Sequence, residues 1–393
     1  MKQGWEIKKL GEVCTIGGGS TPSKTNKDFW ENGAIPWFTI EDIREQGRKI
    51  RYTQKHITEK ALNKTRLFPP KTTLLCCTAS IGEYAISEVE ITSNQQFNGI
   101  VVKDSGILNP YYIFYFAATL KEKLLKLSSK TTIDFVSTGK VKELTIPVPS
   151  LLEQGRIVGV LDAAFAKIDA LKENAQKNLE NAKALFQQVL KQELTPKPNW
   201  QTKKLGEIAL KKLSYGASVP SRNFDGEYRY IRITDIDEDG KLLNDLVSPA
   251  VCEEKHILHS GDLLLARTGG TIGKSYLYSP EDGKCIYAGY LIRVIVNQDI
   301  VLPEFVFLNT KTDRYWKFIK TSQKTAAQPN INAQQYSSFD IPYPPKDEQE
   351  GIVRKIKSIF TKQKQLEKCC QKTIAECDAL KQAVLRRAFN GEL

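Results

Sequence analysis

The side chains best suited to chemistry in this sequence are hydroxyls and cations accompanied by aromatic rings, and they form two sets, one in each half of the chain. The first set is Ser20, Thr21, Lys24, Trp37, Thr39, Thr78 and Ser80. The second set is Tyr215, Ser221, Arg222, Arg232, Thr234, Arg267, Thr268 and Lys274. Groups of this kind contact the phosphates and base edges of DNA. Each residue taken singly is more typical of a solvated loop, so only the collective pattern indicates DNA binding.

Two segments resemble enzyme motifs, and neither motif is complete. Thr268–Ser275 resembles the phosphate-binding loop G-x-x-x-x-G-K-[ST], but a threonine replaces the first glycine. The residues that follow it alternate like a strand, whereas the motif needs a helix N-terminus. Asn109–Tyr112 resembles the N/D-P-P-Y/F loop of adenine methyltransferases without its second proline, and is better explained as a helix cap. We therefore expect no catalytic residues and no cofactor on this chain.

A metal site is also poorly supported. The chain has three histidines, none beside a nucleophile motif, and its 8 cysteines form no C-x-x-C. Acidic residues such as Glu41, Asp42, Asp235 and Asp237 are expected to be solvated turn residues. The prediction for metal ligands is therefore none.

Composition limits the class of protein further. The 393 residues, 41% of them hydrophobic and 26% charged, suffice for two globular domains. The sequence has no run of about 18 apolar residues, and its start lacks the apolar core of a signal peptide. We expect a cytoplasmic protein with no membrane partner. The net charge of +12 suits a polyanion partner, although residues 199–345 contribute only +1 of it.

The elements that must position these side chains include a long helix over residues 151–194. Its apolar positions alternate in steps of four and three, and this period predicts a coiled-coil helix about 60 Å long. The seam positions are Ile157, Leu161, Ile168, Leu171, Asn178 and Leu185. Adding 195 to the seam produces a second series with the same spacing, which includes Ile352, Ile356, Ile359, Leu366, Thr373 and Leu380. Polar seam residues such as Asn178, Gln363 and Thr373 are hypothesised to fix the register between the helices.

The flanking residues repeat with the same offset of 195. Trp5–Glu12 returns as Trp200–Glu207, and Ile146–Gln154 returns as Ile341–Gln349. The chain is therefore two copies of one unit, each with its globular part first and its long helix last.

From this repeat we predict an α+β fold with pseudo-twofold symmetry. Two β-rich domains, at residues 1–149 and 200–345, are joined by helices at 150–194 and 346–393, with a linker at 195–199. Each narrow seam needs a partner and the chain supplies one, so the two helices are expected to form a coiled coil. If they lie antiparallel, the start of the first helix packs on the end of the second.

The repeated frame resembles the specificity subunit of Type I restriction–modification systems. The motifs that carry the resemblance are W-x-x-K-x-L-G-E at Trp5–Glu12 and Trp200–Glu207, and I-P-x-P with E-Q at Ile146–Gln154 and Ile341–Gln349. Gly17–Pro22, Arg267–Gly269 and Ala388–Leu393 are also similar to that family. The resemblance covers essentially the whole chain.

The resemblance implies a non-catalytic, sequence-specific DNA-binding subunit. Each globular unit would be a target recognition domain for one half of a bipartite double-stranded site, with an antiparallel coiled coil setting the spacer. Two methyltransferase (M) subunits and restriction/translocase (R) subunits would be the protein partners. S-adenosylmethionine, ATP and Mg²⁺ would bind those partners and not this chain.

Two alternatives from other classes stay open at this point. The first is a non-catalytic coiled-coil scaffold whose β-rich modules bind proteins without DNA specificity. The second, more weakly supported, is an enzyme with an unrecognised site. A steep salt dependence of duplex binding would favour the DNA-binding interpretation over the scaffold.

Overall fold

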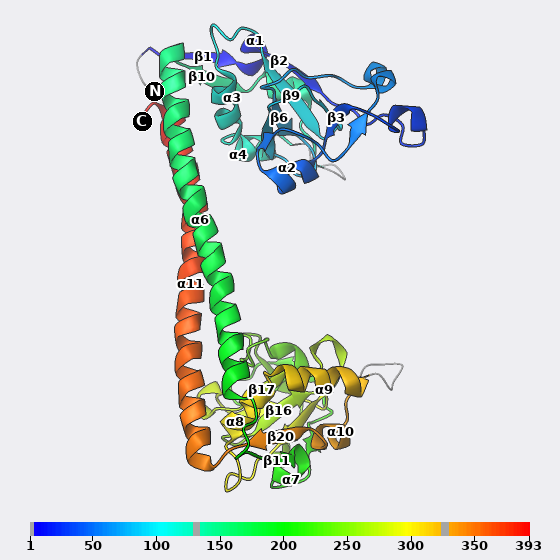
Figure 1. Ribbon diagram of the computed structural model, residues 1–393, viewed down its shortest axis with the longest axis vertical. Helices are drawn as coiled ribbons and strands as arrows, with labels where there is room; N and C mark the ends of the chain where they lie inside the picture. Colours follow the sequence, from blue (N-terminus) through cyan, green and yellow to red (C-terminus); the bar gives the residue numbers. More distant parts are fainter. Residues whose placement is uncertain (1–3, 129–133, 324–329) are drawn as a thin grey trace. The chain divides into compact units, whose positions relative to one another are not determined.

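The computed structural model describes residues 4–128, 134–323 and 330–393, which divide into two compact units (Figure 1). Unit 1 contains the residues up to Gln176 together with Gln371–Leu393, and unit 2 contains Lys177–Cys370. Each unit combines one globular part with portions of both long helices, α6 (Leu151–Glu193) and α11 (Lys346–Asn390). The boundary between the units therefore passes through the middle of both long helices.

Unit 1 is built on a five-stranded sheet of order β2-β9-β6-β7-β4, with a three-stranded sheet of order β5-β3-β8 and the antiparallel pair β1-β10. The strands are β1 (Glu6–Lys9), β2 (Cys14–Gly18), β3 (Ile35–Phe38), β4 (Lys49–Ile50), β5 (His56–Ile57), β6 (Thr73–Cys76), β7 (Tyr84–Ser87), β8 (Thr92–Ser93), β9 (Phe97–Val102) and β10 (Thr145–Val148). Strands β6 and β7 are buried along their whole length. This explains why both appear in the sequence as short, nearly continuous apolar runs.

The helices of unit 1 cover this sheet and connect it to the long helices. They are α1 (Leu10–Val13), α2 (Ile40–Gln46), α3 (Pro110–Ala117), α4 (Lys121–Leu127) and α5 (Thr138–Lys142). Helix α3 begins as predicted, because the Asn109 side chain accepts a hydrogen bond from the N–H of Tyr111 and Pro110 occupies the first turn. The ring of Tyr112, in α3, packs against the ring of Phe389 in α11. Helix α3 therefore joins the sheet to the long helix.

Unit 2 repeats this order with its own sheets: β12-β19-β16-β17, β13-β15, β14-β18 and β11-β20. The strands are β11 (Gln201–Lys204), β12 (Ser214–Tyr215), β13 (Ser221–Asn223), β14 (Arg229–Ile231), β15 (Val247–Pro249), β16 (Leu263–Ala266), β17 (Ser275–Leu277), β18 (Cys285–Tyr287), β19 (Leu291–Val294) and β20 (Asp340–Tyr343). The helices are α7 (Leu205–Ile208), α8 (Pro303–Asn309), α9 (Asp313–Gln323) and α10 (Ala333–Ser337). The pair β11-β20 places Gln201 opposite Tyr343, as β1-β10 places Glu6 opposite Val148. The predicted duplication is thus present in the strand register.

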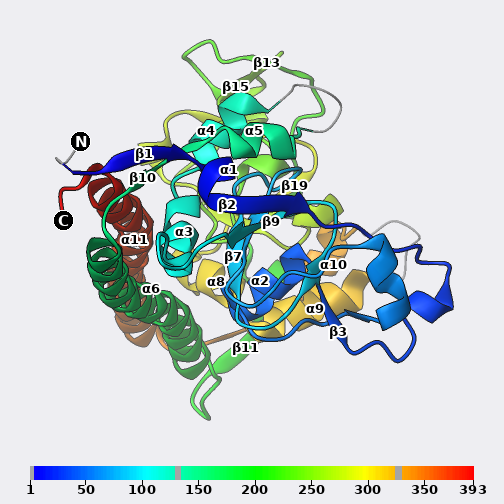
Figure 2. The same ribbon diagram turned by 90° about the horizontal axis from the view of Figure 1, so that it is seen from above.

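The long helices lie beside each other in antiparallel directions within each unit (Figures 1 and 2). In unit 1 the Nζ of Lys172 on α6 lies 2.6 Å from an Asp378 carboxylate oxygen on α11. In unit 2 the Nζ of Lys355, near the start of α11, lies 2.6 Å from Glu193 at the end of α6. Early residues of one helix therefore meet late residues of the other, which confirms the antiparallel pairing.

Of the twelve predicted seam residues, five are buried and seven are not. Ile157, Leu161, Ile168, Ile352 and Ile356 are buried as expected. By contrast, the side chains of Leu171, Leu185, Leu366 and Leu380 are 44–59% exposed, Asn178 is exposed, and Ile359 and Thr373 are only half-buried.

The error arises because, at one of the two seam positions in each heptad, the buried stripe runs one residue later than the prediction placed it. Lys172, Leu179 and Phe186 are the less exposed neighbours of the wrongly assigned residues on α6, so the helix takes the step of four before the step of three. The rings of Phe186 and Phe360 pack 5.3 Å apart between the two helices. Asn178 is exposed and therefore does not fix the register, and the amide of Gln363 donates to Glu367 of its own helix.

Candidate nucleic-acid interface

The two units share one backbone arrangement at the end of their main sheets, where most of the predicted loop residues lie. In unit 2 the N–H of Arg267 donates to the Tyr290 carbonyl and its own carbonyl accepts from Ile331. In unit 1 the N–H of Cys77 donates to the Gln96 carbonyl and its carbonyl accepts from Val136. The bridges Thr78–Phe135 and Thr268–Asn330 follow at the next position. Arg267 and Cys77 are therefore structural equivalents.

The end of the unit 2 sheet carries a cation stacked on an aromatic ring. The guanidinium carbon of Arg267 lies 4.8 Å from the ring centre of Tyr215, and Nε donates to Asn330 Oδ1 at 3.2 Å. The Tyr215 hydroxyl accepts a hydrogen bond from the N–H of Ala333. Tyr215 and Tyr290 are 41% and 61% exposed, so the cluster combines a fixed cation with accessible aromatic surface.

The equivalent end of unit 1 carries hydroxyls and amides. The Ser20 hydroxyl donates to the carbonyl of Lys64, and the Thr21 hydroxyl donates to Gln95 Oε1. Ser20, Thr21, Thr78 and Ser80 are all half-buried. These four residues of unit 1 thus present neutral polar groups, while the guanidinium of the exposed Arg66 lies over the backbone of Gly17 in β2.

Trp37 does not reach this surface. Its side chain is 4% exposed, and its indole N–H donates to the carbonyl of Ser20 at 3.2 Å. The prediction that Trp37 contacts DNA is therefore wrong, because the ring supports the loop from inside. Its burial follows from its place in β3, where it packs against Trp30 with ring centres 5.0 Å apart.

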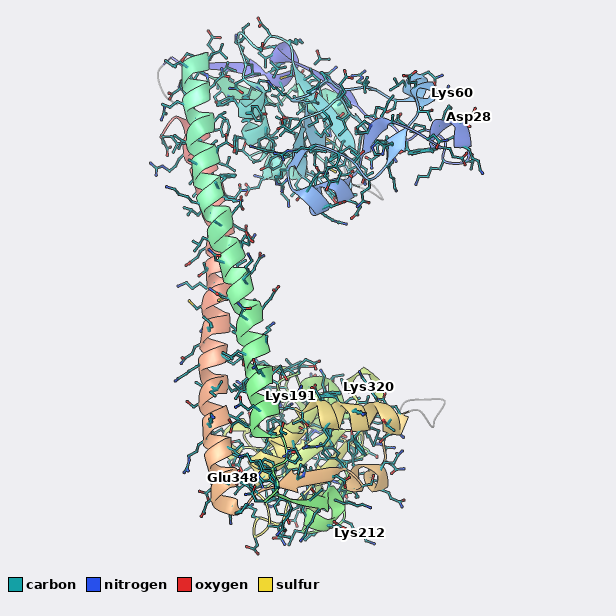
Figure 3. The ribbon with its side chains drawn as sticks, in the orientation of Figure 1. Asp28, Lys60, Lys191, Lys212, Lys320 and Glu348 are labelled. Atoms are coloured by element: carbon teal, nitrogen blue, oxygen red, sulfur yellow. The ribbon has the colours of Figure 1, made fainter. Side chains whose placement is uncertain are left out.

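Lys24 lies on an outlying part of unit 1. It is exposed, and it precedes a short helical turn that includes Asp28. The carboxylate of Asp28 pairs with the Nζ of Lys60 at 3.1 Å, and both residues lie at the outer end of this globular part (Figure 3). Lys24 thus remains a candidate phosphate contact.

Thr39 and Arg232 occupy equivalent positions, and both serve a buried carboxylate. Asp42 accepts the N–H and the hydroxyl of Thr39, at 2.7 and 3.2 Å, and the N–H of Gln54 at 3.0 Å. Asp235 accepts the N–H of Arg232 at 2.8 Å and its guanidinium Nη2 at 2.8 Å.

Asp42 and Asp235 are each 1% exposed, so the expectation that they are solvated turn residues is wrong. They form capping boxes, in which a carboxylate satisfies backbone donors at the start of a helical turn. Thr234 contributes its hydroxyl to Asp235 as well. The repeated spacing of the two aspartates could have revealed this role in the sequence.

The other basic candidates in unit 2 are paired with acids. Arg222, which with Ser221 lies in the exposed strand β13, donates to Asp225 at 2.6 Å. Lys274 Nζ lies 2.9 Å from Glu238. Arg232 also contacts the more exposed Asp245 at 2.6 Å. Among the described residues, Arg267 is the cation of this set without a carboxylate partner.

Two glutamines anchor the long helices to the globular parts. Gln154 Oε1 accepts the N–H of Asn109 at 2.8 Å, and its Nε2 donates to the carbonyls of Ile107 and Pro149. Gln349 accepts the N–H of Leu302 at 2.8 Å and donates to the carbonyls of Ile300 and Pro344.

Both glutamine side chains are fully buried. The sequence shows these residues as a repeated E-Q motif, but their role is visible only in the fold. They hold the start of each long helix against the globular part of its own unit.

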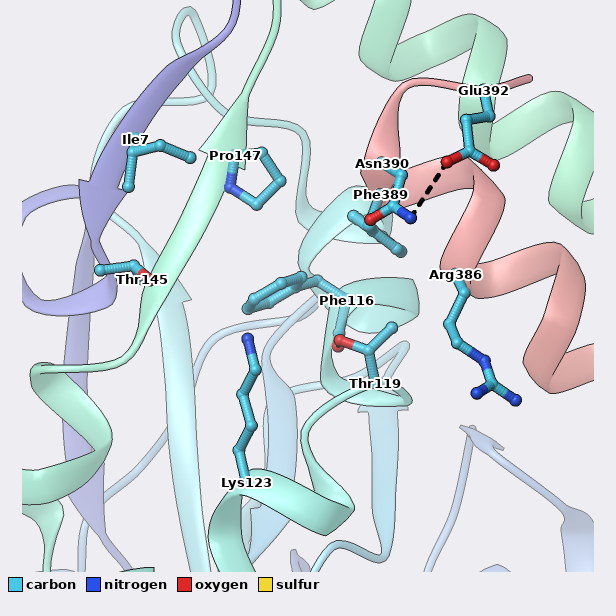
Figure 4. Close-up of a pocket in the computed structure, with 10 residues that line it drawn as sticks. All are labelled: Ile7, Phe116, Thr119, Lys123, Thr145, Pro147, Arg386, Phe389, Asn390 and Glu392. Carbon is cyan, nitrogen blue, oxygen red and sulfur yellow. Dashed lines mark hydrogen bonds between the residues drawn. The ribbon is translucent and has the colours of Figure 1, made fainter. Parts of the chain in front are cut away.

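Each unit also contains a pocket where the last turns of a long helix approach the small helices. The unit 1 pocket has a volume of about 620 Å³ (Figure 4). It is lined by Ile7, Phe116, Thr119, Lys123, Thr145, Pro147, Arg386, Phe389, Asn390 and Glu392. Lys123 extends from α4 toward Phe116, and Asn390 Nδ2 donates to Glu392 at 3.2 Å. This lining combines apolar side chains with cations and polar groups, which suits the binding of a ligand.

A pocket of about 540 Å³ occupies the corresponding place in unit 2. Lys191 lines this pocket and is equivalent to Arg386 at the offset of 195. Thr312 corresponds to Thr119, because each threonine hydroxyl donates a hydrogen bond to the carbonyl three residues earlier. Burial lowers the pKa of the nearby Lys311 to about 8, against the opposing charge of Asp239. Both units therefore have a pocket at this place, lined by Arg386 in unit 1 and by Lys191 in unit 2.

In residues 4–128, 134–323 and 330–393, no group of three or more His, Cys, Asp or Glu side chains is placed to hold a metal ion. Within the same ranges, no helix combines the length and apolar character needed to cross a membrane.

Known proteins share both the domain and the fold. A family model described as the Type I restriction modification DNA specificity domain matches residues 2–181 and again residues 197–376. The chain is 32% identical over 242 residues to the specificity subunit of the Type I restriction enzyme MjaIX of Methanocaldococcus jannaschii, covering 56% of this chain and 54% of that relative. It is 24% identical to the EcoKI specificity subunit of Escherichia coli strain K12, covering 100% of this chain and 90% of that relative.

The match to the first of these relatives thus spans about half of the relative's length. A chain from a solved structure concerned with complex assembly and conformational transition of the type I R-M system superposes with a TM-score of 0.81. That comparison covers 100% of this chain and 99% of the other at 20% identity, and therefore supports the fold alone. Because the family model matches most of the chain, and does so twice at a constant offset, the protein belongs to the family of the Type I restriction modification DNA specificity domain.

Proposed function

We propose that this chain is the specificity subunit of a Type I restriction–modification complex. It binds double-stranded DNA and recognises a bipartite site, with one half-site for each unit and a spacer set by the paired long helices. The observation that carries the proposal is a duplicated backbone with unlike side chains at equivalent loop positions, in a chain of this family. The same frame with different side chains suits the recognition of two different half-sites. A protein-binding scaffold without DNA specificity is not favoured, since the family model is that of a DNA specificity domain.

Catalysis belongs to the partner subunits in this proposal. Two modification subunits bring S-adenosylmethionine, and restriction subunits bring ATP and Mg²⁺, while this chain supplies recognition in the cytoplasm. The support within this chain is the pair of incomplete enzyme motifs: Thr268–Ser275 runs into strand β17, and Asn109 caps helix α3.

DNA binding by the full-length chain tests the proposal directly. Selection from a random duplex library is expected to enrich a split motif, two specified blocks separated by an unspecified gap of constant length. In a salt series the logarithm of the affinity should fall linearly with the logarithm of salt concentration, with a slope of about −0.9 for each neutralised phosphate. A flat salt response, or enrichment of no motif, would contradict a specificity function.

Four exposed leucines at predicted seam positions of the long helices support the recruitment of partners. Leu171 and Leu380 belong to unit 1, and Leu185 and Leu366 belong to unit 2, so each unit carries one from each helix. Leu171 and Leu366 are equivalent at the offset of 195, as are Leu185 and Leu380. Isolated exposed leucines are ordinary, but a set repeated by the symmetry of the chain fits two copies of one partner.

Replacing Leu171 and Leu366 with glutamate is expected to weaken assembly with modification subunits by about tenfold or more, because the charges oppose burial of this surface. Co-purification and analytical ultracentrifugation measure the assembly. The matched control is Gln176→Glu combined with Gln371→Glu, its equivalent at the offset of 195, which adds the same two charges at exposed residues of the two helices. Equal assembly of both variants would remove the leucines from the partner surface.

A further inference from the structure

The side chains at the equivalent end of the two main sheets differ in one decisive respect. Tyr215 of β12 pairs with Ile292 of β19, and in the same place of unit 1 Gly18 of β2 pairs with Asn98 of β9. Arg267 follows β16 as Cys77 follows β6. Unit 2 therefore has an arginine on a tyrosine ring where unit 1 has a cysteine and a glycine.

Arg267 is held by two independent contacts. The Tyr215 ring lies 4.8 Å from the guanidinium carbon, and the Tyr215 hydroxyl is itself fixed by the N–H of Ala333 at 3.0 Å. Asn330 Oδ1 accepts a hydrogen bond from Nε of Arg267 at 3.2 Å. Within the described parts of the chain, neither Nη nitrogen of Arg267 is hydrogen-bonded, so the outer fork of the guanidinium keeps its donors.

A planar fork of two N–H groups, oriented in advance and not neutralised by a carboxylate, matches the O6 and N7 acceptors of guanine in the major groove. Pre-orientation lowers the entropy lost on binding, and the stack limits the fork to one plane. A phosphate would accept the same charge, but it would not need the plane to be fixed by both a ring and an amide.

We propose that Arg267 reads a guanine in the half-site of unit 2, and that Tyr215 and Asn330 are the residues that position it. This inference rests on the proposed DNA specificity function. Unit 1 has no counterpart, because Cys77 is 2% exposed and its thiol is directed to the carbonyl of Leu75. A guanine contact from this position is therefore expected in the half-site of unit 2 only.

Duplex selection with the full-length chain tests this assignment. Arg267→Ala should reduce discrimination at one G·C pair of one half-site by roughly 5-fold to 100-fold, and leave the other half-site as in the wild type. Tyr215→Ala should weaken the preference at the same base pair, whereas Tyr215→Phe, which keeps the ring, should retain most of it. The matched control is Cys77→Ala, the equivalent position in unit 1, which should leave both half-sites unchanged.

The outcomes separate this inference from the proposed function. If the wild type selects a split motif and Arg267→Ala weakens binding to all sequences equally, Arg267 contacts phosphate and the guanine assignment is wrong. If Arg267→Ala selects the wild-type motif with unchanged affinity, Arg267 does not contact DNA. If the wild type itself selects no motif, the specificity function fails and the assignment fails with it. The retained preference of the other half-site shows that the variants are folded.

Discussion

Replacing Gln349 with leucine is expected to destabilise unit 2 by about 3–6 kcal/mol. The substitution nearly preserves side-chain volume, so it leaves little cavity, but it removes the partners of the Leu302 N–H and of the Ile300 and Pro344 carbonyls. Each buried backbone group left without a partner costs about 1–3 kcal/mol. Because Gln349 is fully buried, water cannot replace it without opening the start of α11.

Hydrogen exchange gives the most direct measurement of this effect. In Gln349→Leu the amide of Leu302 should lose protection, while the amide of Asn109, held by Gln154 in unit 1, should keep it. Gln154→Leu should give the reverse pattern. Denaturant unfolding of the full chain then reports the free energy for each unit. Unchanged protection of both amides in both variants would show that the glutamines do not anchor the helices.

The same substitution has a consequence for function if the proposed role holds. Gln349 fixes α11 to its globular part, and the paired long helices are proposed to set the spacer. We expect Gln349→Leu to enrich sites with a wider range of spacer lengths while each half-site keeps its sequence. A loss of half-site sequence with a constant spacer would contradict this division of roles.

Replacing Asp235 with alanine is expected to cost about 2–4 kcal/mol, the second largest effect. It removes a capping carboxylate that is 1% exposed and leaves the side chain of Arg232, 27% exposed, with Asp245 as its remaining carboxylate partner. Breaking a buried charge pair from one side is costly because the other charge stays desolvated. The partial exposure of Arg232 reduces that cost below the value for a fully buried pair.

Three further variants isolate the physical cause. Asp245→Ala removes a partner whose side chain is 72% exposed and should cost at most about 1 kcal/mol. Asp42→Ala removes three hydrogen bonds without stranding a cation, so about 1–3 kcal/mol is expected. In a double-mutant cycle, Arg232→Ala should recover part of the loss caused by Asp235→Ala. If the unfolding free energies lost in Arg232→Ala and Asp235→Ala simply add in the double variant, as measured by denaturant unfolding, the unpaired charge of Arg232 is not the cause.

The sequence alone predicted the features that depend on local pattern and on repetition. The period of the apolar residues predicted both long helices, and the offset of 195 predicted the duplication. The family resemblance, and not the offset, implied the antiparallel pairing. Asn109 with Pro110 predicted the start of α3, because a helix cap is a local interaction. The frame around Trp5 and Trp200 indicated the family, and the family model matches both copies.

Only the tertiary structure decided which of two neighbouring residues faces the partner helix. Leu171 and Lys172 both fit a helical stripe, and the buried choice depends on how the second helix packs. Likewise, the burial of Trp37 and Asp235 depends on neighbours that are distant in sequence. The stack of Arg267 on Tyr215 joins residues on two strands, so no local pattern indicates it. Periodicity and repetition record what each segment prefers by itself, whereas exposure and side-chain partners arise only when separate segments meet in space.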